Sequence, residues 1–489
     1  MLTEELRKAS SASPLFWLLL PIAAYIFLAP NVDFALSLTW HDGQRLAQVT
    51  LFGLVVLLMV AVPGAGLRVS AAWQGLSRFV RWTLSGAFAL GVVSSLLAAH
   101  LRWALLEWGM LVLLIVLALV TAAGRRDAGE SADPVLVLPF YAAALAYAAK
   151  TVVVYLSMLL VGPEYGMPFD ARELYTGFSN IRFFGHVQTM LLPFLLLPVL
   201  WWGTTRLRRM LLWTVPVLWW MLAIGSGTRG TWIALLIGGA VAGGFGNQPG
   251  RRWTVLQLKA LLYGAVAYLV FILLIPELLS RPAAFLYRTD DILSLSHREV
   301  LWDAAVKMAA AHPWLGIGPM HFSDTWNPVA AHPHNAVLQL MAEWGLPAAL
   351  LFTLVFAVAG LKWAMRVRVD TAACPDARRS LISVALLAAL TGAAAQAMVD
   401  GVIVMPVSQT LLAVLCGWAL AQSAAPVTTA VSRRWQLPRL AVVLFAAGAV
   451  ACTVYLDAPR LEQRERVYAE TRPGSILLPR FWAQGWISE

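Results

Sequence analysis

The chain has 489 residues, of which 60% are hydrophobic and 13% are charged, whereas ordinary soluble domains have roughly 45–50% apolar and about 25% charged residues. This composition, with a mean hydropathy of +0.71, excludes a soluble enzyme, a secreted disulfide scaffold and a disordered protein. An outer-membrane barrel is excluded too. Its strands would be segments of ~10 residues in which apolar and polar residues alternate, whereas the runs in this chain are longer and apolar on every face. The formal net charge of +10 makes the placement of the basic residues informative about topology.

Long apolar runs predict the fold class, an all-α integral membrane protein whose polytopic bundle has about 12–13 transmembrane helices. The first run follows a basic start and could be a signal peptide, but it has no clear small-x-small cleavage site, so we interpret it as a membrane anchor. The runs lie near residues 14–30, 46–63, 83–99, 103–122, 135–161, 184–202, 210–225, 230–245, 257–277, 347–365, 380–398, 406–424 and 440–456.

Basic residues gather in alternate loops between these runs. If residues 1–13 are cytoplasmic, all of these loops fall on the cytoplasmic side, as the positive-inside rule requires. The basic residues are Arg68, Arg78, Arg81, Arg125, Arg126, Arg206, Arg208, Arg209, Arg251, Arg252, Lys362, Arg366, Arg368, Arg378, Arg379, Arg433 and Arg434. The opposite face then receives the two substantial loops, 162–183 and 278–333, and we expect function there.

The expected organisation is one catalytic bundle, residues 1–456, followed by a short C-terminal tail, residues 457–489. The bundle includes the large loop 278–333, in which we expect short amphipathic helices. One of these is predicted over 296–308, lying along the membrane surface. Parity of the spans places the tail on the same face as the loop.

A second helix begins at the segment His332-Pro333-His334-Asn335. Pro333 suits a first helical turn, and the free N–H groups of that turn favour a nearby anion. A polar stripe follows at steps of four, formed by Asn335, Gln339 and Glu343. The two histidines either belong to a functional site or simply cap the helix in interfacial water.

Three arginines, Arg182, Arg229 and Arg298, are predicted at the membrane interface of this same face, where positive charge is otherwise scarce. Arginine keeps its charge, and its planar fork matches phosphate oxygens. These residues suit a diphosphate held at the mouth of a bundle. The alternative is that each extends its charge to interfacial water without binding a ligand.

Some charged residues lie inside or beside apolar runs. Lys150 is well inside a run, where a lone charge costs at least ~2.5–3.5 kcal/mol, so it needs a partner or a wet cavity. Glu107 and Asp400 are similar cases for which we expect more access to water.

We expect no metal and no cofactor. The potential ligands His312, His321, Asp324, His332 and His334 are close in sequence, but no HExxH motif or cysteine pair accompanies them. The cysteines Cys374, Cys416 and Cys452 lie far apart and are expected to fill apolar space. A glycine-rich phosphate loop is also lacking, which argues against a nucleotide-linked donor.

In these motifs the chain resembles the O-antigen ligase and polymerase superfamily of bacterial envelope enzymes, over about residues 135–424. The most specific block runs from His334 to Pro347, and three weaker blocks arrive in the family's order. The weaker blocks are 178–186 with Asn180, Arg182 and His186; 226–230 with Arg229; and 297–319 with Arg298, Trp302 and the Pro313–Pro319 turn.

The resemblance implies a metal-independent glycosyltransferase of the GT-C type that takes glycan from undecaprenyl diphosphate on the periplasmic face of the Gram-negative inner membrane. Arg182, Arg229 and Arg298 would bind the diphosphate, and His334 would position or deprotonate the acceptor hydroxyl. The supporting residues would be His332, Asn335, Asn180 and His186. Direct displacement would invert the anomeric configuration.

Several functions remain open within this resemblance. We favour the ligase that transfers O-antigen to lipid A-core, so the expected partners are the lipid-linked donor, lipid A-core and membrane lipids, and not nucleic acid. The alternatives are the O-antigen polymerase and the protein O-oligosaccharyltransferase, although the latter commonly carries a larger domain after the last span. A further alternative is a non-enzymatic transporter of lipid-linked glycans. In such a protein, basic residues would continue through the bundle along the transport path.

Overall fold

The computed structural model describes residues 16–34, 37–281, 283, 297–375, 378–423, 436–472 and 476–488. Over these residues the chain consists of helices joined by turns and loops, without a strand. Arg433, Arg434 and parts of the predicted loop and tail lie outside the described residues.

The principal helices follow the apolar runs in chain order. They are α2 (Phe16–Leu28), α3 (Trp40–Ala61), α4 (Ala65–Gln74), α5 (Arg78–Leu97), α6 (Leu101–Ala128), α7 (Ala132–Leu160), α8 (Ile181–Leu191), α9 (Leu197–Trp202), α10 (Arg206–Ser226), α11 (Arg229–Phe245), α12 (Asn247–Ala267), α13 (Ile275–Leu278), α14 (Arg298–Ala311), α15 (Ala336–Ala373), α16 (Arg378–Gln396), α17 (Pro406–Ser423), α18 (Gln436–Asp457) and α19 (Leu461–Thr471).

The predicted fold class is confirmed. Within the described residues, nine helical stretches are long and apolar enough to cross a membrane, and one of them, Leu101–Leu160, contains both α6 and α7. Two shorter apolar helices, Trp17–Leu28 and Arg229–Phe245, add to these. Each predicted run coincides with a helix or with two consecutive helices, because an apolar run in lipid must satisfy its backbone hydrogen bonds internally.

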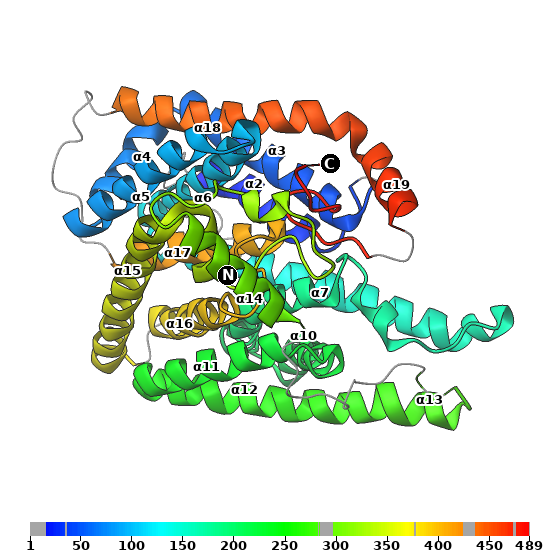
Figure 1. Ribbon diagram of the computed structural model, residues 1–489. Helices are drawn as coiled ribbons and strands as arrows, with labels where there is room; N and C mark the ends of the chain where they lie inside the picture. The colour runs from blue at the N-terminus through cyan, green and yellow to red at the C-terminus, as the bar shows by residue number, and fades with distance from the viewer. Residues whose placement is uncertain are drawn as a thin grey trace.

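The helices form one bundle in which segments far apart in sequence lie side by side (Figure 1). Helix α6 packs against α17 and α18, and α11 packs against α16. Small residues permit close approach, as in many membrane bundles: a Cβ on Gly238 would lie 2.3 Å from the Ala388 carbonyl oxygen, and one on Gly417 would lie 2.2 Å from that of Ala118.

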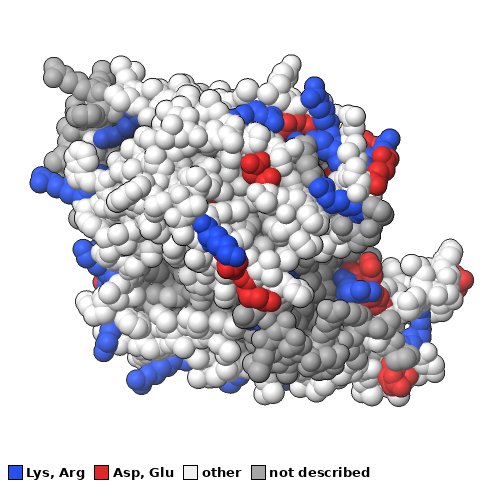
Figure 2. Space-filling view, viewed as in Figure 1, with Lys and Arg blue, Asp and Glu red and all other residues white. Residues whose placement is uncertain are grey.

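The two ends of the bundle differ in charge. At the end that we call the basic end, Arg126 donates to the Leu420 carbonyl at 2.9 Å and Arg379 donates to that of Gln422 at 2.8 Å. At the other end, which we call the site end, Arg102 pairs with Asp457 at 2.8 Å. Figure 2 shows basic side chains largely alone at the left of the molecule, and basic and acidic side chains side by side toward the right.

The site end also carries basic residues besides Arg182, Arg229 and Arg298. The expectation that positive charge is otherwise scarce on this face is therefore wrong. The additional basic residues there are largely paired with carboxylates. Arg102 pairs with Asp457 at 2.8 Å, Arg172 with Asp170 at 2.5 Å, and Lys307 with Asp303 at 2.7 Å.

Helix α14 is the amphipathic helix predicted in the large loop, but its apolar face does not lie on the membrane. That face packs on the protein, where Leu301 and Ala305 are buried against Phe322, Ala330 and Ala342. The described part of the loop thus packs against α15. Its apolar residues form a small buried cluster with Ala342 of that helix.

The described part of the C-terminal tail is an integral part of the packing. Trp482 and Trp486 are each only 1% exposed, and Ala483 donates its backbone N–H to Asp42 of α3 at 2.7 Å. In Figure 1 the C-terminus lies at the site end, between α3 and α19.

Candidate active site

The predicted catalytic histidine lies just before α15, which begins at Ala336, so Pro333 precedes the helix and does not form its first turn as the sequence predicted. Asn335 is the N-cap, and its side-chain oxygen accepts the Leu338 N–H at 3.0 Å, as capping residues do. His334 precedes it with a φ of 54°, a left-handed conformation that is uncommon for a residue other than glycine. The Asn335 amide also donates to the Met398 carbonyl at 3.0 Å, so the start of α15 is fixed to the segment after α16.

Gly345 separates the short polar helix from the long apolar helix that follows it. Its φ of 82° and ψ of 164° interrupt α15, and a Cβ at this position would lie 2.4 Å from the Trp314 carbonyl oxygen. The Pro313–Pro319 turn packs at this kink, where the Leu346 N–H donates to the Pro313 carbonyl at 2.8 Å. The kink therefore determines how the first part of α15, which follows His334 and Asn335, meets the bundle.

Asp400 is the residue that joins two of the predicted site residues. One carboxylate oxygen lies 3.2 Å from Nδ1 of His334, and the other lies 3.4 Å from Nε2 of His186. Asp400 is 3% exposed and His186 is completely buried. The expectation that Asp400 has ready access to water is wrong, because the link between α16 and α17 folds inward against these histidines.

The electrostatics of this pair favour a neutral imidazole beside an ionised carboxylate. Burial would by itself raise the pKa of Asp400, but the neighbouring His186 and His334 hold it well below its ordinary value. Burial lowers the pKa of His334, with Asp400 opposing the shift and Arg298 and Arg182 adding to it. With Nδ1 toward Asp400, the Nε2 atom of His334 is the ring nitrogen that can face a substrate.

His332 completes the histidine group. Its Nδ1 accepts the His334 backbone N–H at 3.3 Å, and the two ring centroids are 4.2 Å apart. Burial lowers the pKa of His332 well below its ordinary value, the positive charge of Arg480 lowers it further, and protonation of His334 would add to this effect. His332 therefore supports the loop as a neutral ring.

The three predicted arginines stand at the beginnings of three helices. Arg182 is the second residue of α8, where Asn180 is the N-cap and accepts the Arg182 N–H at 2.9 Å. Arg229 is the first residue of α11 and Arg298 the first residue of α14. The beginning of a helix carries a partial positive charge. The three helix dipoles and the three guanidinium groups therefore all contribute positive potential.

These arginines are close enough to influence one another and the histidine. Burial lowers the pKa of Arg298, the positive charges of Arg182 and Arg229 lower it further, and Asp400 opposes the shift. The structure thus brings His334, His332, Asn335, His186 and the arginines to one place, with Asn180 in its predicted neighbourhood as a helix cap. Such a cluster can bind an anion beside a neutral base.

The other sequence candidates lie elsewhere. His321 accepts the His100 backbone N–H at 2.9 Å, and Asp324 lies 3.1 Å from the His100 ring, so these residues do not join His334. Within the described ranges, no group of three or more His, Cys, Asp and Glu side chains could hold a metal ion.

Lys150 has the structural partners that its position requires. Its ammonium donates to the Pro30 carbonyl at 3.0 Å and lies 4.5 Å from the ring centroid of Tyr147. Lys150 therefore ties α7 to the end of α2.

Comparison with known proteins bears on residues 214–353, which match the family model described as O-antigen ligase. The matched segment contains Arg229, Arg298 and His334, so the chain is similar to this family over the part that carries three of the predicted site residues. No curated protein matches the chain.

Proposed function

We propose that this protein is an O-antigen ligase, an inverting, metal-independent glycosyltransferase of the GT-C type. It would transfer O-antigen from undecaprenyl diphosphate to lipid A-core in lipopolysaccharide synthesis. The observation that carries the proposal is the buried Asp400–His334 pair, 3.2 Å apart, beside three arginines in a chain whose residues 214–353 match the ligase family.

Each group in the cluster has a role in this reaction. His334 accepts the proton of an acceptor hydroxyl at Nε2, and the hydroxyl oxygen then attacks the anomeric carbon of the donor glycan. The bond from that carbon to the diphosphate oxygen breaks, and undecaprenyl diphosphate leaves with the electron pair. Asp400 stabilises the imidazolium that forms, as a carboxylate does beside a catalytic histidine.

The arginines would act on the leaving group. Arg182, Arg229 and Arg298 would bind the diphosphate oxygens and stabilise the charge that develops as the glycosidic bond breaks. Binding of the donor and departure of the diphosphate therefore depend on the same residues. Because attack and departure occur on opposite sides of the anomeric carbon, the product has inverted configuration.

The proposed orientation places the site end in the periplasm and the basic end in the cytoplasm of a Gram-negative cell. Basic loops at one end support this assignment by the positive-inside rule. The donor and acceptor lipids would both reach the site from the outer leaflet of the inner membrane.

Purified protein tests the proposal with undecaprenyl diphosphate-linked glycan and three parallel acceptors: lipid A-core, a pilin-like protein, or no second acceptor. We expect product on lipid A-core. Product only on the carrier would instead support the polymerase, and product only on protein would support the protein transferase. Donor binding without any transfer would contradict enzymatic function and support transport.

A further inference from the structure

The C-terminal segment, residues 476–488, reaches the loop that carries the catalytic histidine. Arg480 is 2% exposed, and its Nη1 donates to the Ala331 carbonyl at 3.3 Å. Ala331 directly precedes His332 in the sequence. The segment therefore contacts the backbone three residues before His334.

Arg480 also joins two carboxylates from different helices. Its Nη2 lies 2.7 Å from an oxygen of Glu107 on α6 and 2.7 Å from an oxygen of Glu343 on α15. Glu343 in turn accepts the Phe322 N–H at 3.0 Å. One guanidinium thus connects α6, α15 and the loop before His332.

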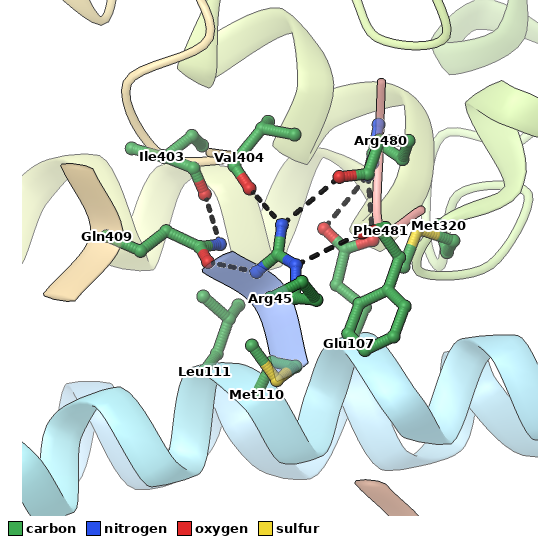
Figure 3. A pocket seen from close by; sticks show the side chains of 10 residues that line it. All are labelled: Arg45, Glu107, Met110, Leu111, Met320, Ile403, Val404, Gln409, Arg480 and Phe481. Atoms are coloured by element: carbon green, nitrogen blue, oxygen red, sulfur yellow. Dashed lines mark hydrogen bonds and ion pairs between the residues drawn. The ribbon is translucent and has the colours of Figure 1, made fainter. Parts of the chain in front are cut away.

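Other side chains hold Arg480 in place (Figure 3). Arg45 of α3 donates to the Arg480 carbonyl at 3.1 Å and to the Phe481 carbonyl at 3.1 Å. The Arg45 guanidinium also donates to Gln409 at 2.7 Å and to the Val404 carbonyl at 2.6 Å. The segment is fixed from α3 and from the region just after Asp400.

Apolar packing brings the same segment against the loop. Tyr468 and Trp486 form a buried cluster with Ala331, and the Ile487 N–H donates to the Ser323 carbonyl at 3.2 Å. Gly485 has a φ of 84°, and a Cβ there would lie 2.9 Å from that of Ala331. The segment and the loop therefore share one buried set of contacts.

We propose that Arg480 is a positioning residue, which fixes the loop through Ala331 and Glu343 so that His334 faces the reacting groups. The catalytic role of His334 in this inference rests on the proposed function. The position of His334 does not, because it is given by the contacts above. Arg480 does not belong to the diphosphate-binding cluster. Its loss should therefore affect the chemical step more than donor binding.

Site-resolved histidine modification by diethyl pyrocarbonate tests the position of the loop without any turnover. His332 and His334 are 2% and 8% exposed, and the exposed His297 in the same chain is the internal reference. Loss of a hydrogen bond to a charged group favours local opening by roughly tenfold, so we expect Arg480→Gln to accelerate modification at His332 and His334 by about that factor. Unchanged rates in folded protein would overturn the proposal.

Arg125→Gln is the matched control. Arg125, which is 8% exposed, forms a buried pair with Asp133 at 2.9 and 2.8 Å, but at the basic end of α6. We expect this variant to lower the unfolding temperature without accelerating modification of His334. Equal acceleration in both variants would show a general loss of stability and would contradict a positioning role.

Arg480→Lys keeps a positive charge between Glu107 and Glu343 but cannot reach all three partners at once, because it lacks the guanidinium fork. We expect intermediate acceleration. If Arg480→Gln fails to fold, this variant decides the question, and wild-type modification rates in Arg480→Lys would refute the proposal.

Kinetics give a second readout. With the enzyme concentration determined by donor binding, we expect Arg480→Gln to lower kcat by about tenfold. The KM for the donor should stay within about twofold of the wild-type value. A raised donor KM with unchanged kcat would contradict positioning of His334. If the wild type transfers glycan to no acceptor, the proposed function fails, while the modification result still decides the placement of the loop.

Discussion

At the scale of single residues, the proposed chemistry depends on Asp400 holding His334 in one orientation. The carboxylate lies 3.2 Å from Nδ1, so Nε2 is the nitrogen that would face the acceptor hydroxyl in the proposed reaction. This one contact therefore influences both the tautomer and the pKa of His334.

Replacement of Asp400 should change both properties at once. Asp400→Asn removes the charge that raises the pKa of His334 and allows the wrong tautomer, so we expect kcat to fall by about 10²–10⁴, the usual contribution of a general base. The acidic limb of the pH profile should move to lower pH. Asp324→Asn, beside His100, is the control, and an equal loss in that variant would contradict the special role of Asp400.

The pH dependence of the wild type follows from the direction of the shift. A general base must be neutral, and burial lowers the pKa of His334 below its ordinary 6.5. We expect transfer at subsaturating donor to be flat between about pH 7 and 8 and to fall only as the pH drops below about 6.5. A limb that begins well above that value would show that His334 is not the titrating base.

Arg298 and Lys307 lie on the same helix and provide a matched pair. Arg298→Gln should raise the donor KM or lower kcat, because a charge-assisted contact to diphosphate is worth about 1.5–3 kcal/mol, or roughly ten- to a hundredfold. Lys307→Gln removes only a surface pair with Asp303, and should leave the kinetics unchanged. Identical kinetics in both variants would mean that Arg298 does not contact the donor.

The site was only partly predictable at this scale. His334 and the three arginines stood out because they lie in short motifs beside apolar runs, where polar side chains are costly unless they have a partner or a ligand. Asp400 was noticed as a charged residue, but its partners, His186 and His334, are distant in sequence. Periodicity carries no information on such a contact, which only the packing of α16 against α8 and α15 creates.

At the scale of elements, the spans were predictable because each is a continuous apolar run, whereas the surroundings of α14 were not. An amphipathic pattern indicates that a face is buried, but it does not distinguish lipid from protein as the partner. The face of α14 that contains Leu301 and Ala305 packs on protein. The kink at Gly345 likewise depends on the Pro313–Pro319 turn that packs against it.

Glycine substitutions in α15 test the kink. Gly345→Ala places a side chain at a positive φ, which costs about 1–2 kcal/mol, and within 2.4 Å of the Trp314 carbonyl oxygen. We expect a lower unfolding temperature and lower activity. Gly360→Ala in the same helix meets nothing within 4 Å and should be neutral or slightly stabilising; equal effects of the two changes would argue against a functional kink.

At the scale of the whole molecule, the proposed orientation determines which residues face the periplasm. Met167, 60% exposed at the site end, should react after Met167→Cys with a membrane-impermeant thiol reagent applied to cells with a permeabilised outer membrane. The exposed Cys374 at the basic end should react only after the inner membrane is broken. Reaction of Cys374 but not of Met167→Cys before the inner membrane is broken would contradict the proposed orientation.

The role of the tail also belongs to this scale and could not be predicted. Its mixture of acidic and basic residues resembles a solvated segment, and nothing in the composition indicates that Arg480 is buried against Glu107 and Glu343. The polar stripe of Asn335, Gln339 and Glu343 was expected to face either protein or a polar cavity. At Glu343 it faces protein, and the partner, Arg480, lies 137 residues further along the chain.

The most direct test of the central claim compares wild-type protein with His334→Ala in one purified assay, with lipid-linked donor, lipid A-core and EDTA present. The account predicts transfer to lipid A-core by the wild type, loss of transfer in the variant, and similar donor binding and unfolding temperature in both proteins. Substantial turnover by His334→Ala, or wild-type activity that EDTA abolishes and a divalent ion restores, would contradict it.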